Sequence, residues 1–351
     1  MCIHLYSFTV FLYFYCTFEN ELIISCTNFP KPIITHMIKR KVEVFAPGSV
    51  SNLGPGFDVL GFALDEPGDY VIARRTSVPG LTFSVRSTGI DVPDNAKDNV
   101  AAHVASLILE EFVPGFGIDM ILEKKMPIGS GLGSSAASSV AAAVAVNALL
   151  PKPSSKMDLL RFAVEGERKA SGSPHADNAA PSLLGGLCLI RSYEPLDVVQ
   201  IPIRNKIFWV VVHPHVVVRT EEARRILPQH IPLRNAVRQW GNVSGLTAGL
   251  IRGESNLIGK CIEDIIIEPV RAGLIPGFYE VQRAALDAGA LGCSISGSGP
   301  SMFAASTSML KARKIAAKMV LTFRQAAKVE CDVYISKVNM KGATVVRTAS
   351  R

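Results

Sequence analysis

Residues 127–138 read PIGSGLGSSAAS, and this stretch decides how the chain folds. It follows a predicted strand over 118–122 and precedes a run of Ala, Val and Ser over 134–150, which we expect to be a helix buried on nearly all sides. Its three glycines allow a tight turn with inward-facing N–H groups, and the start of the helix adds a partial positive charge. Such a turn favours an anion, for example a triphosphate.

The spacing of these glycines matches neither the Walker A motif, because no Lys follows the last Gly, nor the dinucleotide fingerprint. We expect Gly131 and Gly133 to bring main-chain N–H groups against phosphate, with no room for a Cβ and no cost to the fold on substitution. The alternative is a purely structural turn capped by serines.

The remaining chain alternates short strands and helices, which indicates an α+β protein. A first group of strands is predicted over 42–46, 70–74, 81–87, 118–122, 188–191 and 198–203, with helices over 100–112, 134–150 and 158–169. A second group of strands is predicted over 207–212, 293–296, 302–305, 333–338 and 343–346, with helices over 220–227, 236–250, 277–288 and 310–327.

A length of 351 residues suits two domains, and the two groups of elements place their boundary near residue 204. Residues 1–36 differ from the rest, because they contain eight aromatic and only three charged residues. They lack the features of a signal or transit peptide, and their apolar run is short for a membrane span. We therefore predict an extraneous or disordered segment over 1–36 and domains over 37–204 and 205–351.

The composition narrows the classes of partner. The net charge is +7 at pH 7, but basic residues are scattered among acidic ones, so we expect no nucleic-acid partner and interpret the excess as suited to anionic substrates. The seven cysteines form no CxxC pair and no zinc spacing. We expect reduced thiols in a cytoplasmic protein with no membrane partner.

A second polar segment, PGSVSNLGPGFD over residues 47–58, is expected at the exit of the first strand. Asn52 and Asp58 offer an amide and a carboxylate that could hold an ammonium or a hydroxyl group. Gly54 and Gly56 allow close approach of the backbone to a ligand. Taken alone, the segment is equally well explained as an ordinary turn.

A third segment, EGERKASGSPHADN over residues 165–178, is expected to end a helix in a loop. Glu167 is a candidate Mg²⁺ ligand because this ion prefers carboxylate and hydroxyl oxygens. The alternative is a solvated Glu paired with a neighbouring basic residue. A fourth segment, GCSISGSGPS over residues 292–301, either closes over a substrate or forms a tight hairpin.

Together these segments resemble the homoserine kinases of the GHMP family, from about residue 41 to residue 351. The three signature segments of the family are similar to residues 47–58, 127–138 and 292–301, in that order. The stretches HADN at 175–178, RTEEAR at 219–224 and EPVR at 268–271 favour homoserine kinases over mevalonate-type relatives.

The resemblance implies a two-domain GHMP fold, with a ribosomal-protein-like N-terminal domain and a ferredoxin-like C-terminal domain. It implies phosphorylation of L-homoserine by ATP, a step of threonine biosynthesis, in a homodimer. The open alternatives are another GHMP kinase of the mevalonate type and a non-catalytic ligand sensor. Retention of both expected Mg²⁺ ligands argues against the sensor.

The resemblance also implies roles for individual residues. Asn52 and Asp58 would be catalytic and, with His175, would hold the amino and hydroxyl end of homoserine. Arg224 and Arg271 would hold its carboxylate, as two guanidinium forks can, and Gly297 would complete the substrate site. Ser135 and Glu167 would bind Mg²⁺. The ATP-binding residues would be Asn99, Pro127, Ile128, Gly129, Ser130, Gly131, Leu132, Gly133, Ser134, Ser135, Ala136 and Ala137.

Overall fold

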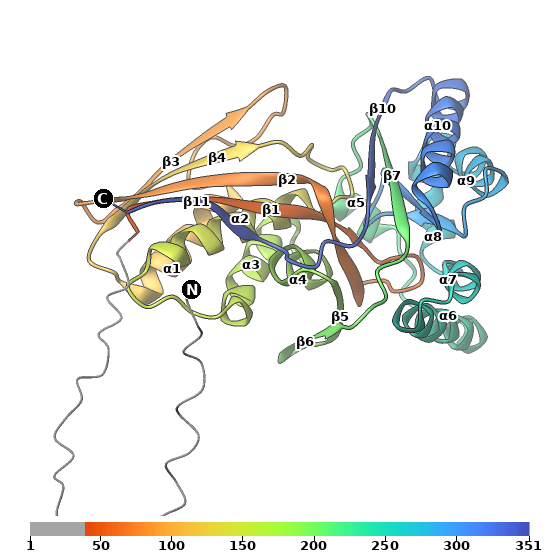
Figure 1. Ribbon diagram of the computed structural model, residues 1–351, viewed down its shortest axis with the longest axis horizontal. Helices are drawn as coiled ribbons and strands as arrows, with labels where there is room; N and C mark the ends of the chain where they lie inside the picture. Colours follow the sequence, from red (N-terminus) through yellow and green to blue (C-terminus); the bar gives the residue numbers. More distant parts are fainter. Residues whose placement is uncertain (1–38, 351) are drawn as a thin grey trace, which may run out of the picture. The chain divides into compact units, whose positions relative to one another are not determined.

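Two β-sheets organise the residues that the computed structural model describes, 39–350 (Figure 1). The segment predicted over 1–36 lies outside these residues. The first sheet has seven strands in the order β11-β1-β2-β4-β3, with β5 pairing β2 and β6 pairing β5. Its strands are β1 (Lys41–Ser51), β2 (Leu60–Thr76), β3 (Gly80–Ser87), β4 (Gly117–Lys124), β5 (Leu187–Tyr193), β6 (Leu196–Ile201) and β11 (Thr344–Ala349).

The second sheet has four strands in the order β10-β7-β9-β8. They are β7 (Phe208–Pro214), β8 (Cys293–Ile295), β9 (Met302–Ser306) and β10 (Cys331–Ser336). Its helices are α5 (Thr220–Arg225), α6 (Leu233–Arg252), α7 (Ser255–Cys261), α8 (Glu268–Arg271), α9 (Phe278–Asp287) and α10 (Met309–Ala326), with a 3₁₀ turn at Ala272–Leu274. Helix α10 packs on β7 and on α9 (Figure 1).

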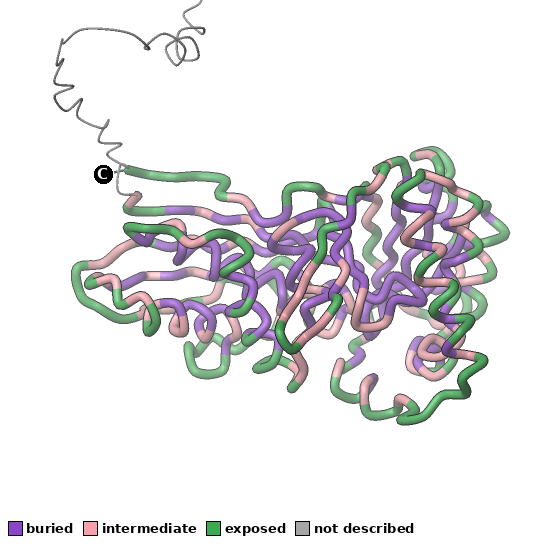
Figure 2. The backbone as a smooth tube through the Cα atoms, turned by 90° about the horizontal axis from the view of Figure 1, so that it is seen from below, coloured by how far each residue is buried: buried purple, intermediate pink, exposed green. Residues whose placement is uncertain are grey.

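Four helices lie on one face of the first sheet (Figure 1). They are α1 (Val100–Phe112), α2 (Ser134–Leu149), α3 (Lys156–Ser171) and α4 (Ala176–Leu184). Helix α2 packs between the sheet and the other helices, and its small Ala, Ser and Val side chains make this close packing feasible. Nearly all of its residues are buried, as predicted, within the buried interior seen in Figure 2.

The two sheets share a hydrophobic core. Trp209 of β7 lies 4.8 Å from Phe62 of β2 and 5.8 Å from Phe303 of β9, measured between ring centroids. These rings join the first sheet to the second. The domain boundary near residue 204 stays a prediction.

The predicted α+β class is confirmed, and each predicted strand and helix is present. Most ends are shifted by a few residues, but β2 begins ten residues before the predicted start at residue 70. Strand β1 runs on through Ser51, so part of the 47–58 segment is strand rather than its exit. The loop expected around Asp177 is wrong, because residues 176–184 form α4 despite the helix-breaking Pro181. The strand expected at 343–346 in the second domain pairs instead with β1 of the first sheet.

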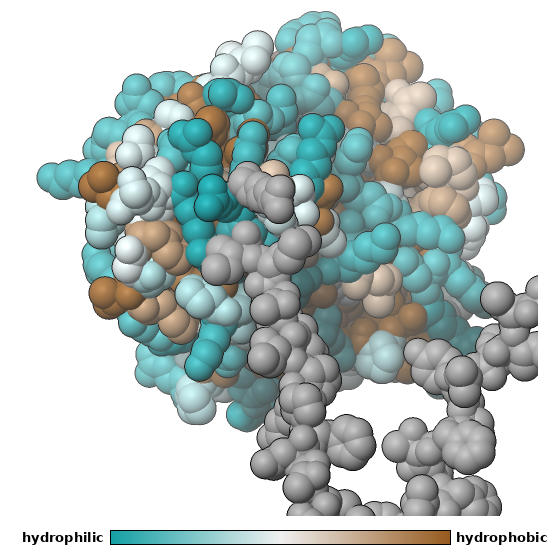
Figure 3. All heavy atoms as spheres, turned by 60° about the vertical axis from the view of Figure 1, so that its left-hand side comes forward, coloured by the Kyte–Doolittle hydropathy of each residue, from teal (hydrophilic) through white to brown (hydrophobic). Residues whose placement is uncertain are grey.

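The surface of the described residues mixes polar and apolar side chains. On the face drawn in Figure 3, hydrophobic residues lie in patches among hydrophilic ones. Every helix within residues 39–350 is too short or too polar to cross a bilayer.

Candidate active site

A cavity of about 820 Å³ brings the four polar segments together. It lies where the glycine-rich loop, the start of α2, the end of α3 and the loops of the second half of the chain meet. The residues selected from the sequence that line it are Asn52, Asp58, Asn99, Pro127, Ile128, Gly129, Ser130, Gly131, Gly133, Ser134, Ser135, Glu167, His175, Arg224, Arg271 and Gly297. Segments far apart in the chain therefore form one site.

Three residues selected for ATP do not line this cavity. Leu132, Ala136 and Ala137 have fully buried side chains that pack in the hydrophobic cores. Their side chains are therefore structural, and only their main-chain groups remain available to a nucleotide. The sequence could not show which residues of the first turn of α2 face the core and which face the cavity, because Ala and Ser are common in both environments.

The glycine-rich loop is held by the fourth segment. Ser296 Oγ donates to Gly131 O at 2.7 Å, and Ser301 N donates to Ser130 O at 3.2 Å. A Cβ added to Gly131 would lie 2.4 Å from Ser296 O and 2.7 Å from Gly299 O, and its φ is +75°. The expected lack of room for a Cβ is confirmed, but neighbouring backbone fills that space, which contradicts the expectation that substitution leaves the fold unaffected.

Gly131→Ala is therefore expected to destabilise the fold. Gly115→Ala is the matched control, because Gly115 has a φ of +73° with no atom within 4 Å of the added Cβ. Both substitutions place a Cβ on a left-handed backbone, which lowers the free energy of unfolding. Only Gly131→Ala also overpacks its surroundings, at a further cost of about 1–3 kcal/mol. Urea unfolding of the two variants measures this difference, and equal losses would show that the loop is loosely packed.

Asn52 connects the first segment to the fourth. Its Nδ2 donates to Gly297 O at 2.8 Å, and its Oδ1 accepts from Asp58 N at 3.0 Å. The amide thus fixes the turn that carries Asp58. The side-chain amide of Asn99 also forms two hydrogen bonds within the protein. Its Oδ1 caps α1 by accepting from Ala101 N at 2.9 Å, and its Nδ2 donates to Pro93 O at 2.8 Å.

Asp58, Arg224 and His175 form a contiguous polar cluster. Arg224 Nη2 donates to both carboxylate oxygens of Asp58, at 2.8 and 2.9 Å, and lies 3.0 Å from His175 Nε2. Burial and the Arg224 charge lower the pKa of His175 to about 4, so its ring is neutral and Nε2 can accept from Arg224. Arg224 is therefore a paired residue of the cavity and not a solvated surface charge.

Arg271 is a buried cation that forms no ion pair with a carboxylate among residues 39–350. Its side chain is 3% exposed and donates to Ala223 O at 3.2 Å and Gly297 O at 3.0 Å. Burial lowers the pKa of Arg271 to about 10, which still leaves it charged at neutral pH. The charges of Asp58, Asp264 and Asp177 partly offset the cost of burying this cation, but none of them forms an ion pair with it. The guanidinium can therefore pair with an anion in the cavity.

Glu167 is buried rather than solvated, which contradicts the alternative interpretation of this residue. Burial raises the pKa of Glu167 to about 7, although a hydrogen bond with Ser135 and the charge of Lys124 act in the opposite direction. Its Oε1 has no hydrogen-bond partner among the described residues. The described residues contain no cluster of three metal-ligating side chains. A free buried carboxylate oxygen beside a serine fits Mg²⁺, because this ion takes one or two protein carboxylates together with substrate phosphates.

The structure adds residues that the sequence reasoning did not select. Asp177 lines the cavity, and burial with the charges of Asp58 and Glu167 raises its pKa to about 8. Asn178 also lines the cavity and accepts from Ser49 Oγ at 2.9 Å. The ring of Phe57 lies 5.1 Å from the Arg271 guanidinium carbon and 5.4 Å from that of Arg224. The HADN stretch carried the signal for the first two, since its polar residues begin a helix facing the cleft.

A cleft that joins a glycine-rich helix start, a buried carboxylate and a buried guanidinium suits an enzyme that binds a nucleotide and a small anionic substrate. The family models for the GHMP kinase N-terminal and C-terminal domains match residues 99–186 and 246–325. The homoserine kinase of Chlorobium phaeobacteroides strain BS1 is 46% identical, over 88% of this chain and 100% of that protein. The homoserine kinase of Pyrococcus abyssi is 40% identical, over 75% and 87%.

Comparison with solved structures supports the same family. The crystal structure of a homoserine kinase from Cytophaga hutchinsonii has a TM-score of 0.83 at 51% identity, covering 88% of this chain and 98% of that one. L. major mevalonate kinase shares the fold, with a TM-score of 0.67 at 19% identity over 86% and 97%. The chain belongs to the homoserine kinases of the GHMP family.

Proposed function

We propose that the chain transfers the γ-phosphoryl group of ATP to the side-chain hydroxyl of L-homoserine, giving O-phospho-L-homoserine and ADP in threonine biosynthesis. The hydroxyl oxygen bonds to the γ-phosphorus while the bond to the bridging β–γ oxygen breaks, and the hydroxyl proton is released. The observation that carries this proposal is the buried, carboxylate-free Arg271 in the same cavity as the glycine-rich loop.

The substrate fits the polar cluster by charge. Arg271 would bind the α-carboxylate, because its guanidinium lines the cavity and forms no ion pair with any described side chain. Arg224 would share that carboxylate, and Asp58 would then exchange its contact with Arg224 for the substrate ammonium. Asn52 and Gly297 hold this turn in place, and the neutral His175 would accept a hydrogen bond from the amino or hydroxyl end.

The nucleotide would lie along the glycine-rich loop, with its phosphates at the start of α2. Ser135 and Glu167 would hold Mg²⁺, which neutralises charge that develops on the β- and γ-phosphates. Phosphoryl transfer through a loose transition state needs little from a base, so positioning and electrostatic stabilisation would supply most of the rate.

Glu167→Gln is expected to raise the free Mg²⁺ concentration needed for half-maximal activity at least about tenfold at pH 8, because the neutral amide is a much weaker ligand for a hard cation. The fold should persist, since the buried charge is removed without a change in shape. Glu165→Gln on the same helix is the control, because its exposed carboxylate pairs with Arg168. An unchanged Mg²⁺ requirement in Glu167→Gln would remove this residue from the metal site.

We also propose a homodimer in the cytoplasm. Support for the dimer comes from Leu233, Val237 and Trp240, which repeat along α6 at helical spacing and are 71%, 55% and 60% exposed. Support for the compartment comes from the free cysteines Cys188, Cys261, Cys293 and Cys331. Light scattering of the purified chain measures the oligomer directly.

The substrate is tested by ADP release with L-homoserine, D-homoserine, L-serine and mevalonate in parallel. We expect L-homoserine to give the highest kcat/KM, because it alone combines the α-carboxylate, the amine in the correct hand and the longer hydroxyl arm. Preference for mevalonate would support the other kinase class, and ADP release with none of them would support a ligand sensor.

A further inference from the structure

A buried ion pair lies beneath the glycine-rich loop, and the proposed reaction does not use it. It joins Asp69 of β2 to Lys124 at the end of β4, with 2.5 Å between Oδ2 and Nζ. Their side chains are 0% and 3% exposed. A charge pair this deeply buried is expensive to desolvate, and apolar side chains of similar size often replace such pairs without loss of stability. Stability alone therefore does not account for it.

Asp69 fixes the chain where it enters the loop. Its Oδ1 accepts from Lys125 N at 2.9 Å and from Met126 N at 3.1 Å. These are the two residues immediately before Pro127. Its Oδ2 accepts from Ser138 Oγ at 2.7 Å. One carboxylate thus holds the entry to the loop and the first turns of α2 together.

Lys124 fixes the other end of the loop. Its Nζ donates to Ser134 O at 2.9 Å and to Ser138 Oγ at 2.9 Å, in addition to Asp69. An ammonium has three N–H donors, so all of them are used inside the protein. Lys124 therefore has no donor left for a phosphate oxygen, although it lines the cavity described above.

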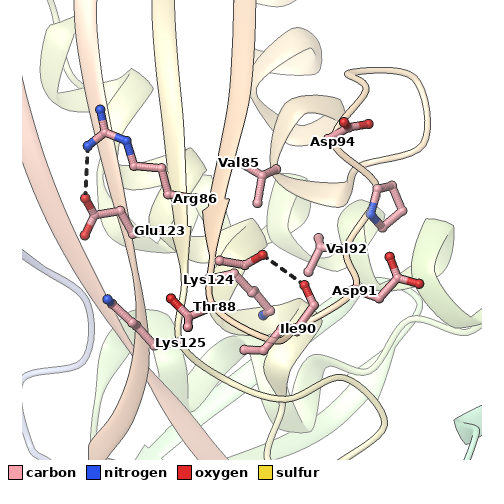
Figure 4. Close-up of a pocket in the computed structure, with 12 residues that line it drawn as sticks. Val85, Arg86, Thr88, Ile90, Asp91, Val92, Asp94, Glu123, Lys124 and Lys125 are labelled. Carbon is pink, nitrogen blue, oxygen red and sulfur yellow. Dashed lines mark hydrogen bonds and ion pairs between the residues drawn. The ribbon is translucent and has the colours of Figure 1, made fainter.

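Lys124 lies between two cavities, but its ammonium is held by groups inside the protein. It also lines a neighbouring cavity of about 990 Å³ beside β3 and β4, shown in Figure 4 with Lys125, Glu123 and Arg86. Arg86 pairs with Glu123 at that rim, whereas the ammonium of Lys124 is held by Asp69 on the buried side of the loop.

We propose that Asp69 and Lys124 are positioning residues that clamp both ends of the glycine-rich loop, so that its N–H groups are arranged for the triphosphate before ATP binds. The inference rests on the proposed use of this loop for ATP. Preorganised donors bind a developing charge without reorganisation, so loosening the clamp should weaken nucleotide binding and leave the homoserine subsite intact.

The test is the doubly neutral variant Asp69→Asn/Lys124→Met, which avoids leaving one buried charge alone. We expect it to fold, with a KM for ATP at least about tenfold higher and a KM for homoserine within about twofold of the wild type. A folded variant with a normal KM for ATP would overturn the proposal, and so would equal increases in both KM values, because a purely structural defect would not discriminate between substrates.

Asp119→Asn is the matched control. Asp119 of β4 pairs with Arg74 of β2 at 2.9 Å, so the same two strands carry an exposed ion pair away from the loop. We expect no change in either KM. If the double variant fails to fold, Ser138→Ala replaces it, because it removes only one link and should still raise the KM for ATP several-fold; an unchanged value would refute the clamp.

Calorimetric titration with a non-hydrolysable ATP analogue separates this inference from the proposed function. A wild-type chain that binds the analogue but phosphorylates no homoserine would refute the function. Weaker binding of the analogue to the double variant would still support the clamp, and equal binding would refute it.

Discussion

Arg271→Leu is expected to raise the KM for L-homoserine about 10- to 100-fold while the KM for ATP stays within about twofold. Arg271 is 3% exposed and forms no ion pair with a carboxylate among the described residues, so the substrate carboxylate would be its direct partner. A hydrogen bond to a charged group contributes about 1.5–3 kcal/mol, and each 1.4 kcal/mol corresponds to a factor of about ten. Initial rates of ADP release, with each substrate varied in turn, measure both constants.

Two controls sharpen this experiment. Arg225→Leu changes the residue beside Arg224 on the exposed side of α5, and both KM values should be unchanged. A thermal melt of Arg271→Leu detects loss of the contacts to Ala223 O and Gly297 O, which also help to hold the fourth segment. Equal rises in the two KM values would assign Arg271 to the scaffold instead of the substrate.

The local pattern of the sequence was enough to predict most elements. Helix α1 begins at residue 100 as predicted, after the capping residue Asn99, and α2 follows the last glycine of the loop. Caps and periodicity are properties of neighbouring residues. Strand pairing depends on distant residues. For this reason the membership of β11 in the first sheet could not be predicted from its own residues.

The candidate site also combines features that depend on neighbouring residues with features that depend on distant ones. Polar segments with unusual glycine content revealed where ligands would bind, but they did not show how these segments contact one another. Burial of Glu167 and the ion pair between Arg224 and Asp58 depend on packing between separate parts of the chain. Asp69 carried no signal at all, because an acidic residue after a Pro-Gly pair in a strand is ordinary until its partners Lys125 and Met126 are seen.

Asp58→Asn is expected to lower kcat/KM for homoserine about 10- to 100-fold while ATP affinity stays within about twofold. Asp58 has a φ of +59°, and Asn is one of the few side chains that tolerate this left-handed backbone, so the turn should keep its shape. The substitution removes the negative charge that pairs with Arg224 and that would receive the substrate ammonium. In the bound state the charge-assisted contact to the ammonium is lost, and such a contact is worth about 1.5–3 kcal/mol.

The measurement combines ADP release with calorimetric titration of a non-hydrolysable ATP analogue. Asp65→Asn, an exposed position on β2, controls for removal of one negative charge and should leave both quantities unchanged. Since Asp58 also raises the pKa of Asp177, its loss should leave Asp177 ionised at lower pH. Full kcat/KM in Asp58→Asn would mean that the Arg224 pair is structural, and the substrate ammonium would then have to be held by Asp177, the next carboxyl in the cavity.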